Sequence, residues 1–158
     1  MIGYVCKYTP VEVFEAMGVE IRRIQPEVTN FNQADTLMHP NICSFIKGVL
    51  ETFSDGGYEG IVLTNCCDST RRLYDLLKQQ CPDKFLYLLD VPRKVNDFST
   101  DMYRKNILDM VHAYEAFSGK TFDEIVLKQL LERREAGQNL RTAPKNNASV
   151  HIGLMGAR

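Results

Sequence analysis

Two adjacent thiols, Cys66 and Cys67, are the side chains of this sequence best suited to chemistry. They follow a continuous apolar run at residues 60–65, which predicts a buried strand, and precede an amphipathic pattern that predicts a helix from Asp68. Ligands of open α/β folds bind at the carboxyl ends of the strands, and the positive end of a helix dipole favours a thiolate. The pair is therefore predicted to do metal or redox chemistry rather than packing.

A third thiol, Cys43, lies in the segment HPNICSF at residues 39–45, near the start of a helix predicted from Pro40. Two helix N-termini could converge on one crevice and supply thiolates to one metal centre. The spacing does not match a zinc finger, because there is no C-x-x-C and the histidines are not paired. Iron–sulfur clusters accept cysteines from separate loops, so a cluster is chemically consistent. The alternative is that Cys43 is a small buried apolar residue.

Four further residues have two readings each. Glu12 closes a predicted capping box with Thr9, yet a carboxylate at a strand–helix junction could also face a substrate and act in catalysis. His39 is a candidate proton donor or a plain loop residue. Cys6 ends a predicted strand and could face the same crevice or be buried. Cys81 continues the apolar face of the helix from Asp68, which favours core packing.

Alternating strand and helix patterns predict an α/β fold: an open, mainly parallel sheet flanked by helices in a three-layer, Rossmann- or flavodoxin-like arrangement, with additional C-terminal helices. Strands are expected at residues 2–6, 19–24, 60–65 and 85–89, a loop at 25–41, and a capping box made by Thr121 and Glu124 at the last helix. The predicted α/β domain spans residues 1–143, and a linker spans 144–149. Residues 150–158 then form the first strand of a truncated second domain, or a terminal strand.

The composition narrows the function classes. A net charge of -1 without a basic stripe argues against a nucleic-acid partner, and no apolar run is long enough for a membrane span. No export signal is evident, so a cytoplasmic location is expected, where five cysteines favour metal or redox chemistry over disulfides. The phosphate loop of ATPases, the dinucleotide fingerprint and the hydrolase nucleophile elbow are all missing from the sequence.

Three motifs occur in one order along the chain. They are GYVCKYTPVE at residues 3–12, ADTLMHPNICS at 34–44 and TNCCDSTRRLYD at 64–75. Together they resemble the 2-hydroxyacyl-CoA dehydratase family, which includes 2-hydroxyglutaryl-CoA dehydratase subunits, benzoyl-CoA reductase subunits and double-cubane cluster reductases. The similarity runs from residue 2 to the C-terminus, and three motifs in register are more specific than any one of them.

The resemblance implies a lyase of anaerobic metabolism that carries a [4Fe–4S] cluster held by three cysteines. An ATP-dependent activator protein would inject one electron, the acyl-CoA substrate would become a ketyl radical anion, and water would leave. The partners implied are an acyl-CoA, a sister subunit in a heterodimer and the activator. The missing ATP loop agrees with ATP being hydrolysed on the activator.

Carried over by residue, the resemblance makes Cys43 and Cys67 cluster ligands, with Cys66 as the alternative to Cys67. The third family cysteine belongs to a later domain, so it is expected outside this chain, and Cys6 or Cys66 could replace it. Three alternatives stay open: a related acyl-CoA or double-cubane reductase subunit, a truncated non-catalytic scaffold, and a thiol redox protein. A disulfide between adjacent cysteines would be strained, which disfavours the last.

Overall fold

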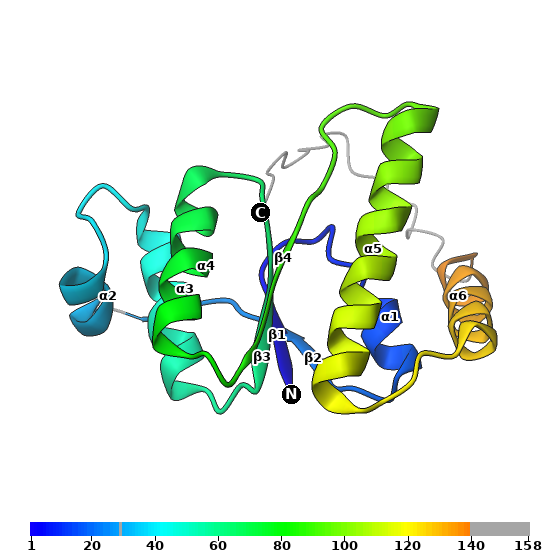
Figure 1. Ribbon diagram of the computed structural model, residues 1–158, viewed down its shortest axis with the longest axis horizontal. Coiled ribbons are helices and arrows are strands. Elements are labelled where there is room, and N and C mark those ends of the chain that lie inside the picture. Colours follow the sequence, from blue (N-terminus) through cyan, green and yellow to red (C-terminus); the bar gives the residue numbers. More distant parts are fainter. Residues whose placement is uncertain (29, 140–158) are drawn as a thin grey trace, which may run out of the picture.

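A four-stranded parallel sheet forms the centre of the computed structural model, which describes residues 1–28 and 30–139 (Figure 1). The strands lie in the order β2-β1-β3-β4, and every neighbouring pair is parallel. Their bounds are Ile2–Tyr4 for β1, Ile21–Arg23 for β2, Gly60–Thr64 for β3 and Phe85–Leu89 for β4. The predicted α/β class is therefore confirmed.

Helices cover both faces of this sheet (Figure 1). The helices are α1 (Val11–Ala16), α2 (Asn32–Leu37), α3 (Ser44–Asp55), α4 (Asp68–Gln80), α5 (Asp97–Ser118) and α6 (Glu124–Asn139). One layer holds α2, α3 and α4, and the other holds α1 and α5, with α6 packed outside α1. The additional C-terminal helices predicted from the sequence are thus present as α5 and α6.

Strand β3 is buried on both faces, which explains its uninterrupted apolar sequence. Ile61 and Leu63 pack into the core beneath α3 and α4, together with Leu73 of α4. Val62 points the other way, into the core beneath α1 and α5, where it joins Tyr114. Successive strand residues alternate between faces, so one short strand anchors both helical layers. Its carboxyl end is held rigidly just before the cysteine pair.

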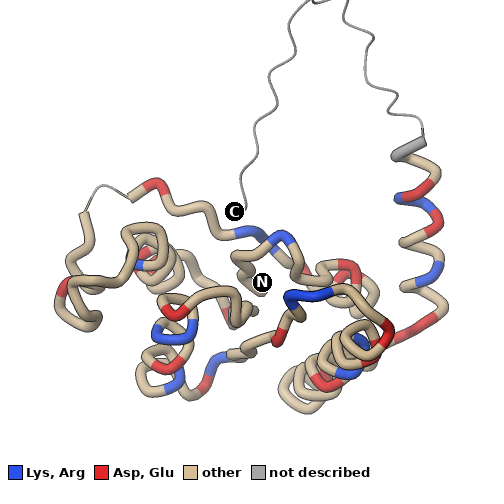
Figure 2. The backbone as a smooth tube through the Cα atoms, turned by 90° about the horizontal axis from the view of Figure 1, so that it is seen from above, with Lys and Arg blue, Asp and Glu red and all other residues tan. Residues whose placement is uncertain are grey.

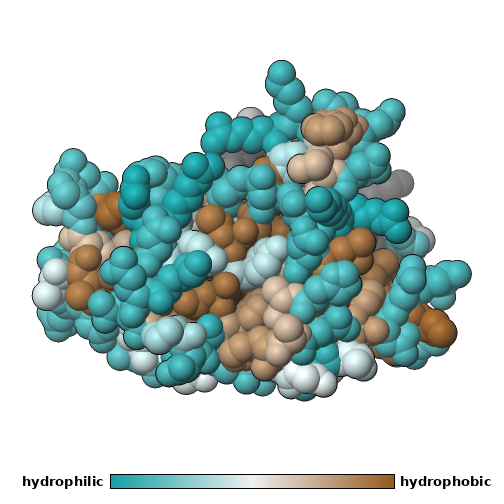
Figure 3. All heavy atoms as spheres, viewed as in Figure 1, coloured by the Kyte–Doolittle hydropathy of each residue, from teal (hydrophilic) through white to brown (hydrophobic). Residues whose placement is uncertain are grey.

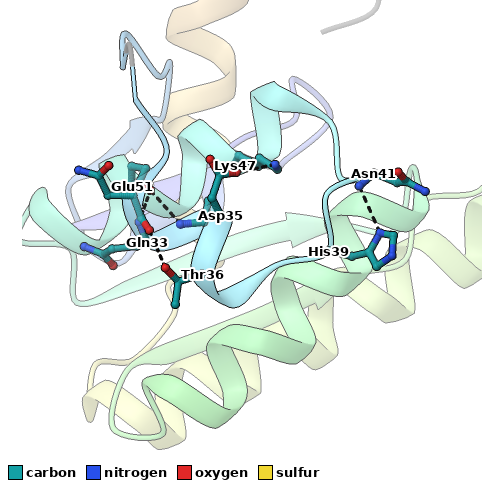
Figure 4. Close-up of polar contacts among 9 residues, drawn as sticks. Gln33, Asp35, Thr36, His39, Asn41, Lys47 and Glu51 are labelled. Atoms are coloured by element: carbon teal, nitrogen blue, oxygen red, sulfur yellow. Dashed lines mark hydrogen bonds and ion pairs between the residues drawn. The ribbon is translucent and has the colours of Figure 1, made fainter.

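The predicted loop at residues 25–41 is wrong in one part, because it contains the short helix α2. The carboxylate of Glu51, a buried residue of α3, accepts hydrogen bonds from the backbone N–H groups of Gln33 and Ala34 at 2.8 and 2.9 Å (Figure 4). Lys47 of α3 also pairs with Asp35 at 2.7 Å. These contacts fix α2 against α3. Because Glu51 and Lys47 are distant in sequence from α2, the residues of α2 themselves carry no pattern that predicts a helix.

Both predicted capping boxes are wrong. The Thr9 side chain does not cap α1, and its hydroxyl is buried without a hydrogen-bond partner among the described residues. Glu12 instead forms an ion pair with Arg134 of α6. At α6, the carboxylate of Asp123 rather than Thr121 accepts hydrogen bonds from the first backbone N–H groups of the helix. Long-range pairing and a better local acceptor displace the caps expected from spacing.

The surface of the described residues shows no strong charge segregation. Acidic and basic positions alternate along α6 and are mixed elsewhere (Figure 2). Apolar side chains gather between the two helical layers, where the edge strand β4 lies with its central residues half-buried (Figure 3). Within the described ranges, none of the helices is long and apolar enough to cross a membrane. The predicted linker at 144–149 and strand at 150–158 lie outside the described residues.

Candidate functional site

A cavity of about 680 Å³ opens beyond the carboxyl ends of β1, β2 and β3. Four chain segments build it, because each parallel strand releases its loop at the same edge of the sheet. The segments contribute Val5, Cys6, Lys7 and Tyr8 after β1; Pro26, Val28 and Phe31 after β2; Cys43, Ser44, Phe45, Ile46 and Gly48 at the start of α3; and Cys66, Cys67 and Thr70 at the start of α4. Four of the five cysteines therefore line one cavity.

The start of α4 holds the cysteine pair. Cys67 is the N-cap residue of the helix, and the Thr70 hydroxyl lies 2.9 Å from its sulfur. The same hydroxyl lies 3.7 Å from the sulfur of Cys66. Thr70 is only 2% exposed, whereas both thiols are exposed to the cavity side of the molecule. The thiols therefore lie at a helix N-terminus and face a cavity, as predicted, and one buried hydroxyl contacts both sulfurs.

The Cys66 thiol ionises more easily than an ordinary thiol. Partial burial raises its pKa, but the polar groups around the sulfur, namely the side chains of Thr64, Thr70 and Cys67, outweigh burial and lower the pKa below its usual value. The Thr64 hydroxyl is fully buried and makes no hydrogen bond within the described residues. A thiolate at Cys66 would partly satisfy it. The local electrostatics therefore favour sulfur as an anion, the form that binds metals.

Cys43 reaches the cavity from α3, where it is the N-cap residue and is exposed. The expected convergence of two helix N-termini on one crevice is thus observed. Cys6 comes from the loop after β1, which is anchored where Tyr103 of α5 donates a hydrogen bond of 2.7 Å to the backbone carbonyl of Tyr8. The thiols are consequently presented by loops that the sheet and both helical layers hold in place.

The loop between β3 and α4 is also tied to the neighbouring strand. The side chain of Asn65 bonds to the Asp90 carboxylate and accepts a hydrogen bond of 3.1 Å from the backbone N–H of Val91. Both residues directly follow β4. This clasp fixes the turn that carries Cys66 and Cys67.

The other candidates lie outside this cavity. His39 is exposed, lines a separate cavity of about 180 Å³, and accepts a hydrogen bond of 3.2 Å from the backbone N–H of Asn41 (Figure 4). Glu12 is ion-paired with Arg134 and is not among the cavity-lining residues. Cys81 caps the end of α4 and packs against the core. The structure brings the sulfurs together and leaves the two proton-transfer candidates elsewhere.

The donor set suits an iron–sulfur cluster in its chemistry. Soft thiolates on separate loops are the ligands such clusters use. Yet no three His, Cys, Asp or Glu side chains of the described residues form a group that could hold a metal ion. The residues present therefore match such a cluster in the type of their donor atoms, and they form no complete metal site within the described part of the chain.

The sequence model of the 2-hydroxyglutaryl-CoA dehydratase D-component family matches residues 6–146. The chain belongs to this family. The match includes the two motifs that carry Cys43, Cys66 and Cys67, and it begins at Cys6, within the first motif. Every segment that builds the cavity thus lies within the family region, apart from Val5.

Among curated proteins, the family member is similar to the (R)-phenyllactyl-CoA dehydratase beta subunit of Clostridium sporogenes. The two sequences are 25% identical over 162 residues, which cover 98% of this chain and 42% of that subunit. The chain therefore spans less than half the length of the curated relative it matches.

Several cavity residues are not predicted from the sequence. Phe31 lies in a segment predicted as a loop, and neither Phe45 nor Lys7 has a local signal for a binding site. Thr70 could have been noticed, because it follows the N-cap Cys67 by three residues, the spacing at which a side chain reaches back to a cap. Spacing alone does not distinguish such a contact from an ordinary helix residue, and the distance to the sulfur identifies it.

Proposed function

We propose that this chain forms the cysteine-bearing part of a 2-hydroxyacyl-CoA dehydratase subunit, in which Cys43 and Cys67 hold a [4Fe–4S] cluster. Cys66 is the alternative to Cys67, and a cysteine outside this chain supplies the third ligand. The observation that carries the proposal is the cavity of about 680 Å³ that Cys43 and Cys67 line together from two separate helix N-termini. Family membership supports the acyl-CoA substrate class.

The reaction balances without net oxidation. Hydroxide leaves from C2 of the 2-hydroxyacyl-CoA, a proton leaves from C3, and a C2–C3 double bond forms. When bound, the cluster would supply one low-potential electron for the thioester carbonyl, and that electron is returned after water has left. An ATP-dependent activator protein is proposed as the source of the first electron, and a sister subunit as the partner in a heterodimer.

The residues of this chain would bind the cluster and hold its ligands in place. Cys43 and Cys67 provide the sulfur donors, and the clasp at Asn65 holds the turn that carries the second of them. Neither Glu12 nor His39 receives a proton-transfer role, because neither lines this cavity.

A related acyl-CoA reductase would use the same cysteines, so analysis of the products is needed to distinguish dehydration from reduction. Loss of water from a 2-hydroxyacyl-CoA identifies a dehydratase, whereas a net gain of two electrons and two protons by an unsaturated acyl-CoA identifies a reductase. The 2-hydroxyacyl-CoA dehydratase assignment is preferred because it is the reaction of the matching family and of its curated relative by name.

The decisive experiment is anaerobic reconstitution of the chain with iron and sulfide, with a small thiol in excess to serve as the outside ligand. Iron and sulfide content and the EPR spectrum of the reduced sample measure the cluster. We expect near-stoichiometric cluster in the parent chain and its loss in Cys43→Ala and in Cys67→Ala.

Cys81→Ala is the matched control, because Cys81 lies outside the cavity at the end of α4. It should retain the cluster in full. Cys66→Ala settles which thiol of the pair is the ligand, since retention of the cluster there assigns the bond to Cys67. A colourless protein whose metal content ignores both ligand variants would refute the proposal.

A further inference from the structure

Besides the thiols, the cavity has an apolar wall. It is made by Val5, Val28, Phe31, Phe45 and Ile46, which come from three different segments. Val5 and Ile46 are buried, whereas Val28, Phe31 and Phe45 are half-buried and leave part of their surface uncovered. Uncovered aromatic and aliphatic surface inside a cavity favours an apolar ligand group.

Close packing at Gly48 holds part of this apolar wall in place. Gly48 of α3 lets the segment after β2 approach closely, since a Cβ at that position would lie 2.7 Å from Cβ of Pro26 and 3.2 Å from a methyl of Val28. Any side chain at Gly48 would push this segment away from α3. The close packing therefore positions the wall at a fixed distance from the thiols at the two helix N-termini.

Among the described residues that line the cavity, none offers a fixed partner for a carboxylate. Lys7 is the only Asp, Glu, Lys or Arg side chain among them. Lys7 is exposed, and its ammonium group lies 5.2 Å from the centre of the Tyr8 ring rather than within the apolar wall. A carboxylate placed against Phe31 and Phe45 would lose its hydration without gaining a buried ion pair.

We infer that the substrate carries an apolar acyl group, branched aliphatic or aromatic, and not an acyl group that ends in a second carboxylate. The thioester end faces the thiols, and the acyl side chain packs against Phe31 and Phe45. The volume of about 680 Å³ lies within the usual range of small-molecule sites. This inference rests on the proposed function, because it names the substrate class of the same site.

The test compares affinities of unreactive, saturated thioesters for the full chain by isothermal titration calorimetry. The ligands are acetyl-CoA, glutaryl-CoA, 4-methylpentanoyl-CoA and 3-phenylpropanoyl-CoA. A fully buried methylene is worth about fourfold in affinity. We expect the two apolar thioesters to bind at least tenfold more tightly than glutaryl-CoA, which should bind no better than acetyl-CoA.

Phe31→Ala and Phe45→Ala should each remove at least fivefold of this preference while leaving acetyl-CoA affinity unchanged. Phe98→Ala is the matched control, because Phe98 is 76% exposed on α5 and lies outside the cavity. Far-UV circular dichroism and a thermal scan establish that each variant folds. Should one Phe variant fail to fold, the ligand comparison in the parent chain still decides.

The possible results separate the two claims. Equal binding of glutaryl-CoA and the apolar thioesters, or tighter binding of glutaryl-CoA, overturns the inference and leaves the proposed function standing. Binding of none of the thioesters overturns both.

A second inference comes from Thr70, whose hydroxyl has two sulfurs as its only hydrogen-bond partners among the described residues. Thr70 is 2% exposed, and its hydroxyl lies closer to the sulfur of Cys67 than to that of Cys66, at 2.9 against 3.7 Å. When the sulfur is deprotonated or bound to a metal it can only accept, so the hydroxyl donates. We infer that Thr70 is a positioning residue that orients the Cys67 sulfur as a ligand of the proposed cluster.

Cadmium alone is the probe, because its thiolate charge-transfer absorbance reports binding without an assembled cluster. Partners behind a ligand are worth about 10- to 100-fold in metal affinity. We therefore expect Thr70→Val to weaken Cd²⁺ binding by at least tenfold with little change in the thermal midpoint, and Thr70→Ser to restore it to within about threefold. A merely structural role would move the midpoint and would not depend on the hydroxyl.

Thr100→Val is the control, because Thr100 is an exposed residue of the first turn of α5 whose hydroxyl bonds the backbone of Asn96. It should bind Cd²⁺ as the parent chain does. Equal Cd²⁺ affinity in Thr70→Val and the parent chain overturns the role of Thr70 alone. Cd²⁺ binding that survives Cys67→Ala unchanged overturns the assignment of Cys67 as well.

Discussion

Gly60, the first residue of β3, is the position where a single methyl group should most disturb the sheet beneath the thiols. It pairs in register with Phe85 of β4. A Cβ at Gly60 would lie 2.4 Å from the carbonyl oxygen of Phe85 and 2.6 Å from its Cβ. The first distance is roughly 1 Å short of an ordinary contact. Because the nearest atom belongs to the backbone, rotation of a side chain cannot relieve the clash.

The two strands must therefore separate, at the point where the backbone N–H of Phe85 donates a hydrogen bond of 3.0 Å to Glu59. Overpacking of a well-filled core costs about 1–3 kcal/mol. A stretched backbone hydrogen bond adds about 1 kcal/mol. We expect Gly60→Ala to lower the free energy of unfolding by about 2–4 kcal/mol, a large part of the roughly 5–15 kcal/mol typical of a domain.

Urea unfolding followed by far-UV circular dichroism measures this change. Gly137→Ala is the matched control, because a Cβ at this exposed helical glycine of α6 meets no atom within 4 Å. Alanine is the better helix former, so this variant should be unchanged or more stable by up to about 1 kcal/mol. Gly60→Ala within 0.5 kcal/mol of the parent chain (roughly the scatter of such measurements) would refute the reasoning, as would a larger loss in Gly137→Ala.

Three further outcomes are expected. Arg134→Ala should speed proteolytic cleavage within α6 while lowering overall stability by about 1 kcal/mol or less, because its partners on α1 are partly exposed; unchanged cleavage would contradict this. Cys66 should react with iodoacetamide at lower pH in the native protein than in urea, because its pKa is lowered only in the folded state. The thiolate therefore stabilises the fold at pH values above the pKa of the unfolded chain, and this contribution is lost as the pH falls through the pKa of the folded state. Coincident profiles would count against this. Tyr103→Phe should cost about 1 kcal/mol by removing the hydrogen bond to Tyr8 and should loosen the loop that carries Cys6, seen as faster alkylation of that thiol; an unchanged rate would argue against this anchoring.

The features that could be predicted from the sequence are those with strong local signals. The runs that became β3 and β4 are short, apolar and bounded by turn residues, so their positions follow from the chain alone. The start of α4 at Asp68 and the place of Cys43 and Cys67 at helix N-termini follow in the same way. Parallel connectivity then brings the loops to one edge of the sheet, which is why the shared cavity of the thiols was foreseeable.

What could not be predicted depends on contacts between distant segments. The carboxylate that holds α2 comes from Glu51, and the partner that removes Glu12 from a capping role comes from α6. The apolar wall is likewise assembled from three segments, and its shape depends on the missing side chain of Gly48. No local pattern encodes a distance between such segments, so the sequence could predict where the thiols lie but not the chemistry of the wall that faces them.

The cavity combines thiols at helix N-termini with apolar side chains from a connecting segment. Cys43 and Cys67 lie at the ends of rigid elements, as the N-cap residues of α3 and α4, whereas Val28 and Phe31 of the apolar wall come from the segment between β2 and α2. Substitutions at Val28 or Phe31 can therefore reshape the apolar side of the cavity without moving Cys43 or Cys67. Under the proposed function, a scaffold of this kind would separate the residues that hold the cluster from those that select the substrate. The acyl group that this chain prefers would then depend on Val28, Phe31 and Phe45 rather than on the cysteine motifs.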